Sequence, residues 1–164
     1  MDALTLLREQ AANADSLLLQ AFESVTPDQA GWRLSGSAAN TIGATFFHCY
    51  ASVDEITGQL LARPRLFESG GWSERLGYDT KTVWSFEGKH DPGLLVAYAG
   101  EVSAAASAYL AGLTPNDLDR EIETRRGPRP LAGRLSVYLV IHQFQHLGEI
   151  AALLGCQGVK GLPF

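Results

Sequence analysis

The chain has little of what marks a membrane or secreted protein. We find no apolar run long enough to cross a bilayer, so no membrane contact is expected. The start, Met1–Leu4, is acidic and lacks the basic residues and cleavage site of a signal peptide. Only two cysteines occur, Cys49 and Cys156, which is too few for a disulfide framework. Both stand in apolar surroundings, so we expect free, buried thiols in the reducing cytoplasm.

Positive charge is also scarce. Lys and Arg number 13 against 18 Asp and Glu, for a net charge of -5. The densest basic group, Arg125, Arg126 and Arg129, is short and interrupted by Gly and Pro, as expected for a solvated loop. A nucleic-acid partner needs a basic surface, so this balance argues against one. The partner we expect is a small-molecule substrate.

Alternation of apolar and polar residues, the mark of a half-buried strand, is missing, whereas helical periodicity is present in four segments. The composition is that of an ordinary globular protein, with 46% apolar and 19% charged residues, and the length suits one domain over residues 1–164. The predicted helices cover residues 4–22, 38–61, 91–111 and 131–154. The third begins at Asp91-Pro92, a good cap, and the fourth stops at Gly155. The fold class is therefore all-α, a four-helix bundle with long crossover connections.

The longer connection, residues 62–90, is rich in aromatic side chains: Trp72, Tyr78, Trp84 and Phe86. Such a density predicts a segment packed over the bundle, with a short helix at residues 72–76. Trp72, Trp84 and Phe86 either anchor this segment in the core or line a substrate pocket. His90, at the end of the connection, is expected at the surface or at a pocket rim.

Three histidines suggest a metal site. His142 and His146 are four residues apart, so a helix presents both on one face, where they can bind one divalent ion. His48 lies in the second predicted helix. Three imidazoles from two facing helices leave open positions on the ion, as in catalytic sites. The alternative is that these histidines are hydrogen-bonded core residues.

A repeated sequence pattern supports the prediction that the three histidines lie close together. Thr26-Pro27 follows the first predicted helix and Thr114-Pro115 follows the third, each resembling a capped helical turn. A helix with a candidate ligand comes next in both halves. Pseudo-twofold symmetry would then bring the second and fourth helices together.

Two further side chains are candidates to support the site. Glu149, three residues beyond His146, can orient its ring, although an exposed salt bridge is an equal alternative. Tyr138, four residues before His142, can offer a hydroxyl to the same cavity or simply pack in the core. Cys49 points about 100° away from His48 and is expected in the core, not as a ligand.

These motifs together resemble the DinB-like superfamily, which includes YfiT-type bacillithiol transferases and mycothiol-dependent relatives. The matching parts are Phe46–His48, the run from His142 to Ile150, and the ending Gly158–Phe164, in the same order along the whole chain. The resemblance implies nickel or zinc at His48, His142 and His146, and a homodimer.

The resemblance does not imply one reaction. It favours a thiol S-transferase that uses a low-molecular-weight thiol cosubstrate. A metal-dependent hydrolase and a non-catalytic, stress-related metal-binding bundle are the alternatives. A metal ion can activate either a thiol or water, so the histidines do not separate these readings.

Overall fold

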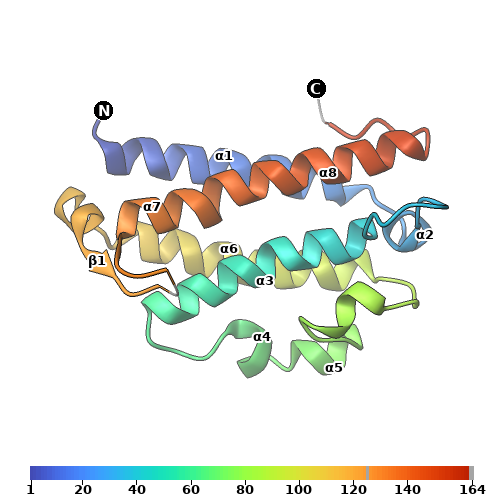
Figure 1. Cartoon of the computed structure of the whole chain (residues 1–164), viewed down its shortest axis with the longest axis horizontal. Coiled ribbons are helices and arrows are strands. Elements are labelled where there is room, and N and C mark those ends of the chain that lie inside the picture. Colours follow the sequence, from blue (N-terminus) through green and yellow to red (C-terminus); the bar gives the residue numbers. More distant parts are fainter. Residues whose placement is uncertain (125, 163–164) are drawn as a thin grey trace.

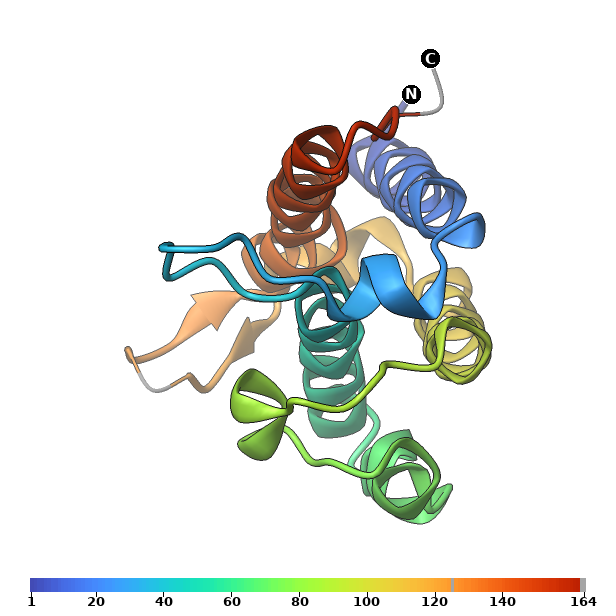
Figure 2. The same cartoon turned by 90° about the vertical axis from the view of Figure 1, so that its right-hand side faces the viewer.

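The computed structural model describes residues 1–124 and 126–162. Within them, the chain forms a bundle whose long members lie side by side along the molecule (Figure 1) and enclose a common core when seen end-on (Figure 2). The members are α1 (Ala3–Glu23), α3 (Ile42–Leu60), α6 (Pro92–Ala111) and a continuous run of α7 (Leu131–Ser136), η3 (Val137–Ile141) and α8 (His142–Cys156). The predicted all-α bundle is confirmed.

Side-chain caps decide where the helices begin. The carboxylates of Asp2 and Asp91 and the hydroxyl of Thr41 each accept a hydrogen bond from the backbone N–H three residues on. Such a cap satisfies one of the amides that the first turn leaves free. The predicted start at Asp91-Pro92 is therefore correct. The second long helix begins at Ile42 rather than Ala38, because Thr41 caps it.

The C-terminal helix runs past its predicted stop. Gly155 is helical, α8 ends at Cys156, and the left-handed residue that follows is Gly158, with φ 75°. The amide of Val159 donates to the carbonyl of Leu154 and closes the end, so Gly158 supplies the backbone freedom expected of Gly155. Cys156 on this last turn is exposed, which corrects the expectation of two buried thiols; Cys49 is buried.

A π-helical turn, η3, interrupts the fourth helix immediately before His142. The amide of His142 donates to the carbonyl of Val137, five residues back. Such turns are rare and occur often at functional sites. The apolar periodicity of the segment predicts a continuous helix but does not reveal this change of winding.

The long connection packs over the bundle, as predicted, through α4 (Leu66–Ser69), α5 (Trp72–Leu76) and η1 (Thr82–Ser85). The buried carboxylate of Asp54, on α3, fastens it. Asp54 accepts hydrogen bonds from the amides of Leu66 (2.9 Å) and Phe67 (2.8 Å) and from the Tyr98 hydroxyl (3.1 Å). Trp72 is fully buried, with its ring 5.3 Å from that of Tyr98, so it anchors the core.

Each of the two predicted capped turns begins a short helix, and the second helix is followed by a hairpin that was not predicted. Thr26 and Thr114 both form capping boxes, at α2 (Pro27–Gly31) and η2 (Pro115–Asp119). In the described part of the chain, β1 (Glu121–Ile122) and β2 (Arg129–Pro130) pair as an antiparallel hairpin. Strands of two residues are too short to show alternation. Arg126 and Arg129 are exposed, as expected, and Arg125 lies outside the described residues.

Among the described residues, α6 alone is long and apolar enough to span a membrane, with a mean hydropathy of 1.4. This corrects the expectation that no segment reaches that length. The helix packs instead along α1 and α3 as a member of the bundle. Its buried face includes Leu95, Tyr98 and Val102.

His90 is buried, not at a rim. It is 1% exposed, with Nε2 3.0 Å from the Thr41 hydroxyl and Nδ1 3.2 Å from the Tyr78 hydroxyl. Its ring lies against Gly43, where an added Cβ would overlap it. The expected surface position is wrong because the loop before α6 folds inward over the start of α3.

Burial of His90 predicts a loss of stability in acid. Burial, reinforced by the charge of Arg33, lowers the pKa of His90 from 6.5 to about 4. Between these values the unfolded chain binds a proton that the folded chain does not, so stability falls as pH drops from 6.5 towards 4. The slope is at most about 1.4 kcal/mol per pH unit. Urea unfolding at several pH values should show that His90→Gln loses less stability than the wild type between pH 6.5 and 4. An equal loss of stability in the two proteins would show that His90 is not its cause.

Candidate metal centre

The structure brings His48, His142 and His146 together between α3 and α8. One ring nitrogen of each lies within 4.8 Å of the other two, and all three side chains are half-buried. The Nε2 atoms of His142 and His146 are 3.0 Å apart. The ring of His48 is 5.1 Å from that of His142 and 5.2 Å from that of His146, measured between centroids.

Helical spacing and the packing of α3 on α8 explain why the three histidines lie close together. The four-residue spacing in α8 aligns His142 and His146 on one face. Direct packing of α3 on α8, as the repeated capped turns predict, adds His48 from the opposite side. The structure thus supplies the facing helices that the sequence argument required.

Burial favours the neutral form of two of these rings, His142 and His48. It lowers the pKa of His142 to about 4, and the charges of His146 and His48 act in the same direction. The pKa of His48 is also lowered, mainly by burial and then by His146. Neutral imidazole is the form that binds a metal ion, so these two shifts favour ligation by His142 and His48.

Glu149 orients His146. Its Oε2 lies 3.0 Å from His146 Nδ1, and its Oε1 accepts a hydrogen bond from the Thr45 hydroxyl at 3.4 Å. An ionised carboxylate only accepts, so it holds the proton on Nδ1 and leaves the Nε2 lone pair facing His142. Thr45, one turn before His48, was not identified from the sequence. Its only signal is that it lies on the same helix face.

The donor set fits a divalent ion. Nitrogen ligands lie about 2.0–2.1 Å from zinc, so two of them are at most about 4.2 Å apart. The ring nitrogens of the cluster lie within 4.8 Å of one another, and those of His142 and His146 are 3.0 Å apart. One feature departs from the usual pattern: Nδ1 of His142 is buried without a hydrogen-bond partner among the described residues. Ligating histidines normally hold this second nitrogen by a hydrogen bond.

Tyr138 borders the cluster without a recorded hydrogen bond to it. Its ring is 6.1 Å from that of His142, and its hydroxyl accepts a hydrogen bond from Arg134 at 3.2 Å. The guanidinium of Arg134 also lies 4.5 Å from the ring centre of Tyr138. Cys49 points into the core, as expected, and burial raises the pKa of its thiol.

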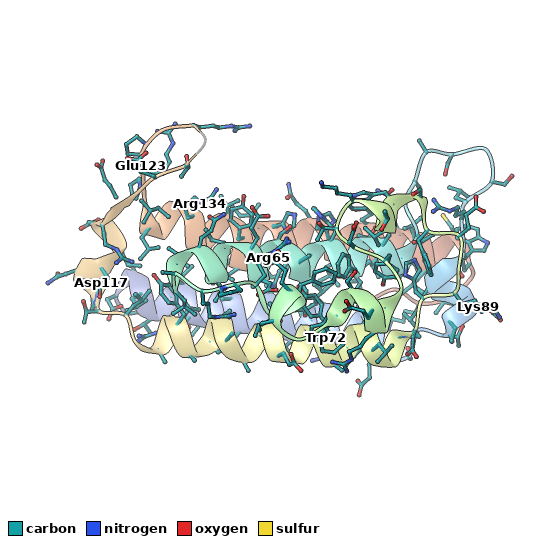
Figure 3. The ribbon with its side chains drawn as sticks, turned by 90° about the horizontal axis from the view of Figure 1, so that it is seen from below. Arg65, Trp72, Lys89, Asp117, Glu123 and Arg134 are labelled. Atoms are coloured by element: carbon teal, nitrogen blue, oxygen red, sulfur yellow. The ribbon has the colours of Figure 1, made fainter. Side chains whose placement is uncertain are left out.

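Two hollows lie along α3, and the smaller one includes His48 of the cluster. The smaller, of about 260 Å³, is lined by His48, Trp84 and Arg65 among others. Trp84 therefore lines a pocket, with its ring 5.0 Å from that of His48. The larger groove, of about 1080 Å³, lies between α3, the hairpin and η3 and includes Tyr138. Figure 3 shows this face, with Arg65 near its middle and Arg134 towards the hairpin.

Comparisons with known proteins agree with this architecture. A family model described as the DinB superfamily matches residues 10–150. A crystal structure of a conserved protein from Enterococcus faecalis superposes with a TM-score of 0.76 at 17% identity. The superposition covers 94% of this chain and 99% of that one, and it shows a shared fold. No curated protein matches the chain by sequence. Residues 163–164 of the ending used in the resemblance lie outside the described residues.

Electrostatic coupling within the cluster predicts a measurable shift in metal-free protein. His48→Asn removes one positive neighbour of His142, so the pKa of His142 should rise above about 4. A ¹⁵N-edited NMR titration of the imidazoles measures it directly. His90→Gln is the matched control, since His90 makes its recorded side-chain contacts with Thr41 and Tyr78. A pKa of His142 that is unchanged or lower in His48→Asn would contradict the proximity of the rings.

Proposed function

Because this chain belongs to the DinB superfamily, we propose that it is a metal-dependent enzyme of the thiol S-transferase type. The observation that carries the proposal is the convergence of His48, His142 and His146 on one point. We propose nickel or zinc as the ion, and a low-molecular-weight thiol and a small electrophile as the substrates.

Each residue of the proposed site has a distinct role. His48, His142 and His146 would hold the ion, and Glu149 fixes the ring of His146. A divalent ion with open positions lowers the pKa of a bound thiol or water by several units. The ring of Trp84 lies 5.0 Å from that of His48 and forms one wall of the pocket there.

The proposed reaction is a substitution at carbon. The thiol loses its proton to solvent, and its sulfur attacks the electrophilic carbon to form an S–C bond. The leaving group departs with the electron pair of the bond that breaks. Arg65 lines the pocket beside His48, and its guanidinium is paired there with the Glu68 carboxylate at 2.6 Å.

Two further features belong to this proposal. We propose a homodimer, as the family resemblance implies, and sedimentation equilibrium would test it. A cytoplasmic location accords with two free thiols, Cys49 and Cys156, because cysteines stay reduced there.

Metal analysis is the first test. Tag-free protein should carry about one equivalent of nickel or zinc by mass spectrometry, and His48→Ala and His142→Ala should each lose it. His90→Gln removes the fourth histidine, which lies outside the cluster, and should keep the metal. Circular dichroism should show helical spectra for all variants. Loss of metal from none of the variants, or absence of metal after loading, would remove the proposed site.

Activity decides between thiol and water. With an alkylating electrophile and a panel of low-molecular-weight thiols, the metal-loaded protein should consume thiol faster than buffer does. His142→Ala should abolish the difference and His90→Gln should retain it. Hydrolysis of the electrophile without thiol would identify a hydrolase instead. A metal-loaded protein that turns over neither would leave a metal-binding bundle without catalysis.

A further inference from the structure

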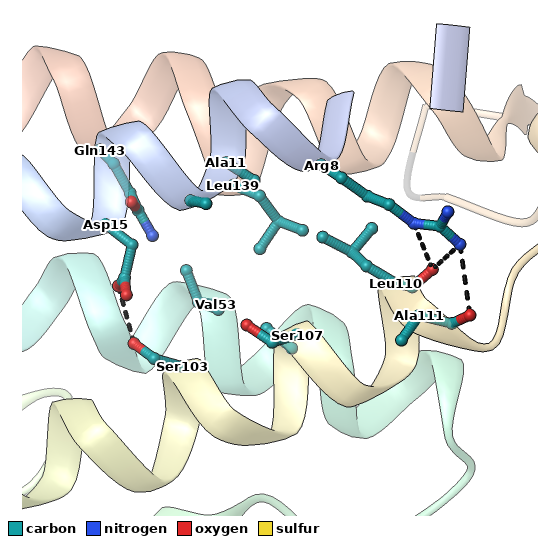
Figure 4. Close-up of a pocket in the computed structure, with 12 residues that line it drawn as sticks. Arg8, Ala11, Asp15, Val53, Ser103, Ser107, Leu110, Ala111, Leu139 and Gln143 are labelled. Carbon is teal, nitrogen blue, oxygen red and sulfur yellow. Dashed lines mark hydrogen bonds between the residues drawn. The ribbon is translucent and has the colours of Figure 1, made fainter. Parts of the chain in front are cut away.

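A second cavity lies between α1 and α6 and shares no lining residue with the histidine cluster. Its volume is about 380 Å³, and Figure 4 shows it in close-up. Pockets for small molecules usually measure about 300–1,000 Å³ and combine apolar walls with a few polar groups. This cavity has both features.

The walls are apolar and come from every long helix. Small side chains of α1 and α6, including Ala11, Ala106 and Ala111, leave the space open. Val53 of α3 and Leu139 of η3 close its floor, at 1% and 4% exposure. The cavity is therefore an opening into the bundle core, not a furrow on its surface.

One end of the cavity is polar. Asp15 Oδ1 accepts hydrogen bonds from the hydroxyls of Ser103 (2.7 Å) and Tyr50 (2.9 Å). Among the described residues, no hydrogen bond to Asp15 Oδ2 is recorded. Gln143 lies at the same end (Figure 4), is 3% exposed, and has its Oε1 buried without a partner in the described chain. Buried polar atoms in native proteins are normally paired, so Gln143 Oε1 is an acceptor that lacks a donor at this end of the cavity.

Among the described residues that line the cavity, none places a positive charge beside Asp15. Arg8 is the only positively charged lining residue, and it lies two turns before Asp15, about 10 Å along the helix. Its guanidinium donates to the carbonyls of Leu110 (2.7 Å), Ala111 (3.2 Å) and Leu113 (2.9 Å), at the C-terminal end of α6. Arg8 thus closes the far end of the cavity and leaves the Asp15 carboxylate without a counter-charge.

We propose that this cavity is a binding site for a small organic amine with an apolar body. The ammonium N–H groups donate to Asp15 Oδ2 and, after rotation of the amide, to Gln143 Oε1. The apolar body lies along Ala106, Leu110 and Leu139. An alcohol of the same length lacks the charge, and a carboxylate is repelled by Asp15. The inference does not rest on metal binding, since the residues involved are outside the histidine cluster.

The test uses hexylamine, hexanol and hexanoate as probes of the full chain at pH 7.5, followed by ¹H–¹⁵N NMR. Hexylamine should shift the amides of Asp15, Ser103 and Gln143 and bind at least tenfold more tightly than hexanol, while hexanoate should not bind. Butylamine should bind about tenfold more weakly than hexylamine, because it buries two fewer methylenes.

Two variants locate the site. Asp15→Asn keeps an acceptor for Ser103 and Tyr50 and should weaken hexylamine binding at least tenfold, with hexanol unaffected. Ser107→Leu fills the cavity from its exposed edge and should weaken both probes. Ala104→Leu is the matched control, an exposed position on the same helix that does not line the cavity.

Three results would overturn the inference. Equal binding of the three probes would remove the role of charge. Hexylamine shifts that persist in Ser107→Leu would place its binding elsewhere. A dimer that Ser107→Leu dissociates, with no probe bound to the wild type, would show that a second copy of the chain covers the cavity.

Discussion

The burial of α3 through the middle of the molecule is the constraint on which the rest of the structure depends. The helix packs on α6 along one side and on α8 along another, and the long connection crosses it. Asp54, 1% exposed, fastens that connection with three hydrogen bonds. Because α3 is fixed from several directions, His48 has one position relative to α8. The candidate metal centre follows from packing that is mostly apolar.

Sequence patterns predict what is local and periodic in this protein. The helices, their caps at Asp91 and Thr26, and the shared face of His142 and His146 all follow from spacing. The predictions that were wrong concern features that depend on tertiary structure. Nothing near His90 in the sequence indicates that its loop folds over Gly43. The sequence also does not show which of two glycines, Gly155 or Gly158, ends α8.

Side-chain contacts between segments far apart in the sequence could not be predicted either. Thr45 contacts Glu149 only because α3 and α8 meet, and Gln143 faces a cavity built by helices far apart in sequence. A polar residue beside a histidine in an apolar helix has no signal of its own. The π turn before His142 likewise changes winding without changing composition. Ligation of a metal by the three histidines stays a prediction, while their proximity is a property of the fold.

The buried polar atoms that lack partners are concentrated in one helical run. Within the described chain they are Arg134 Nε, His142 Nδ1 and Gln143 Oε1, which lie on both sides of the π turn. Each unpaired buried group costs about 1–3 kcal/mol. Elsewhere the chain pairs such groups, as at Asp54 and His90. Two of the three exceptions are adjacent residues: His142 belongs to the histidine cluster and Gln143 lines the cavity between α1 and α6. Gln143 Oε1 is therefore unpaired in a residue of the cavity proposed above, and His142 Nδ1 is unpaired within the histidine cluster.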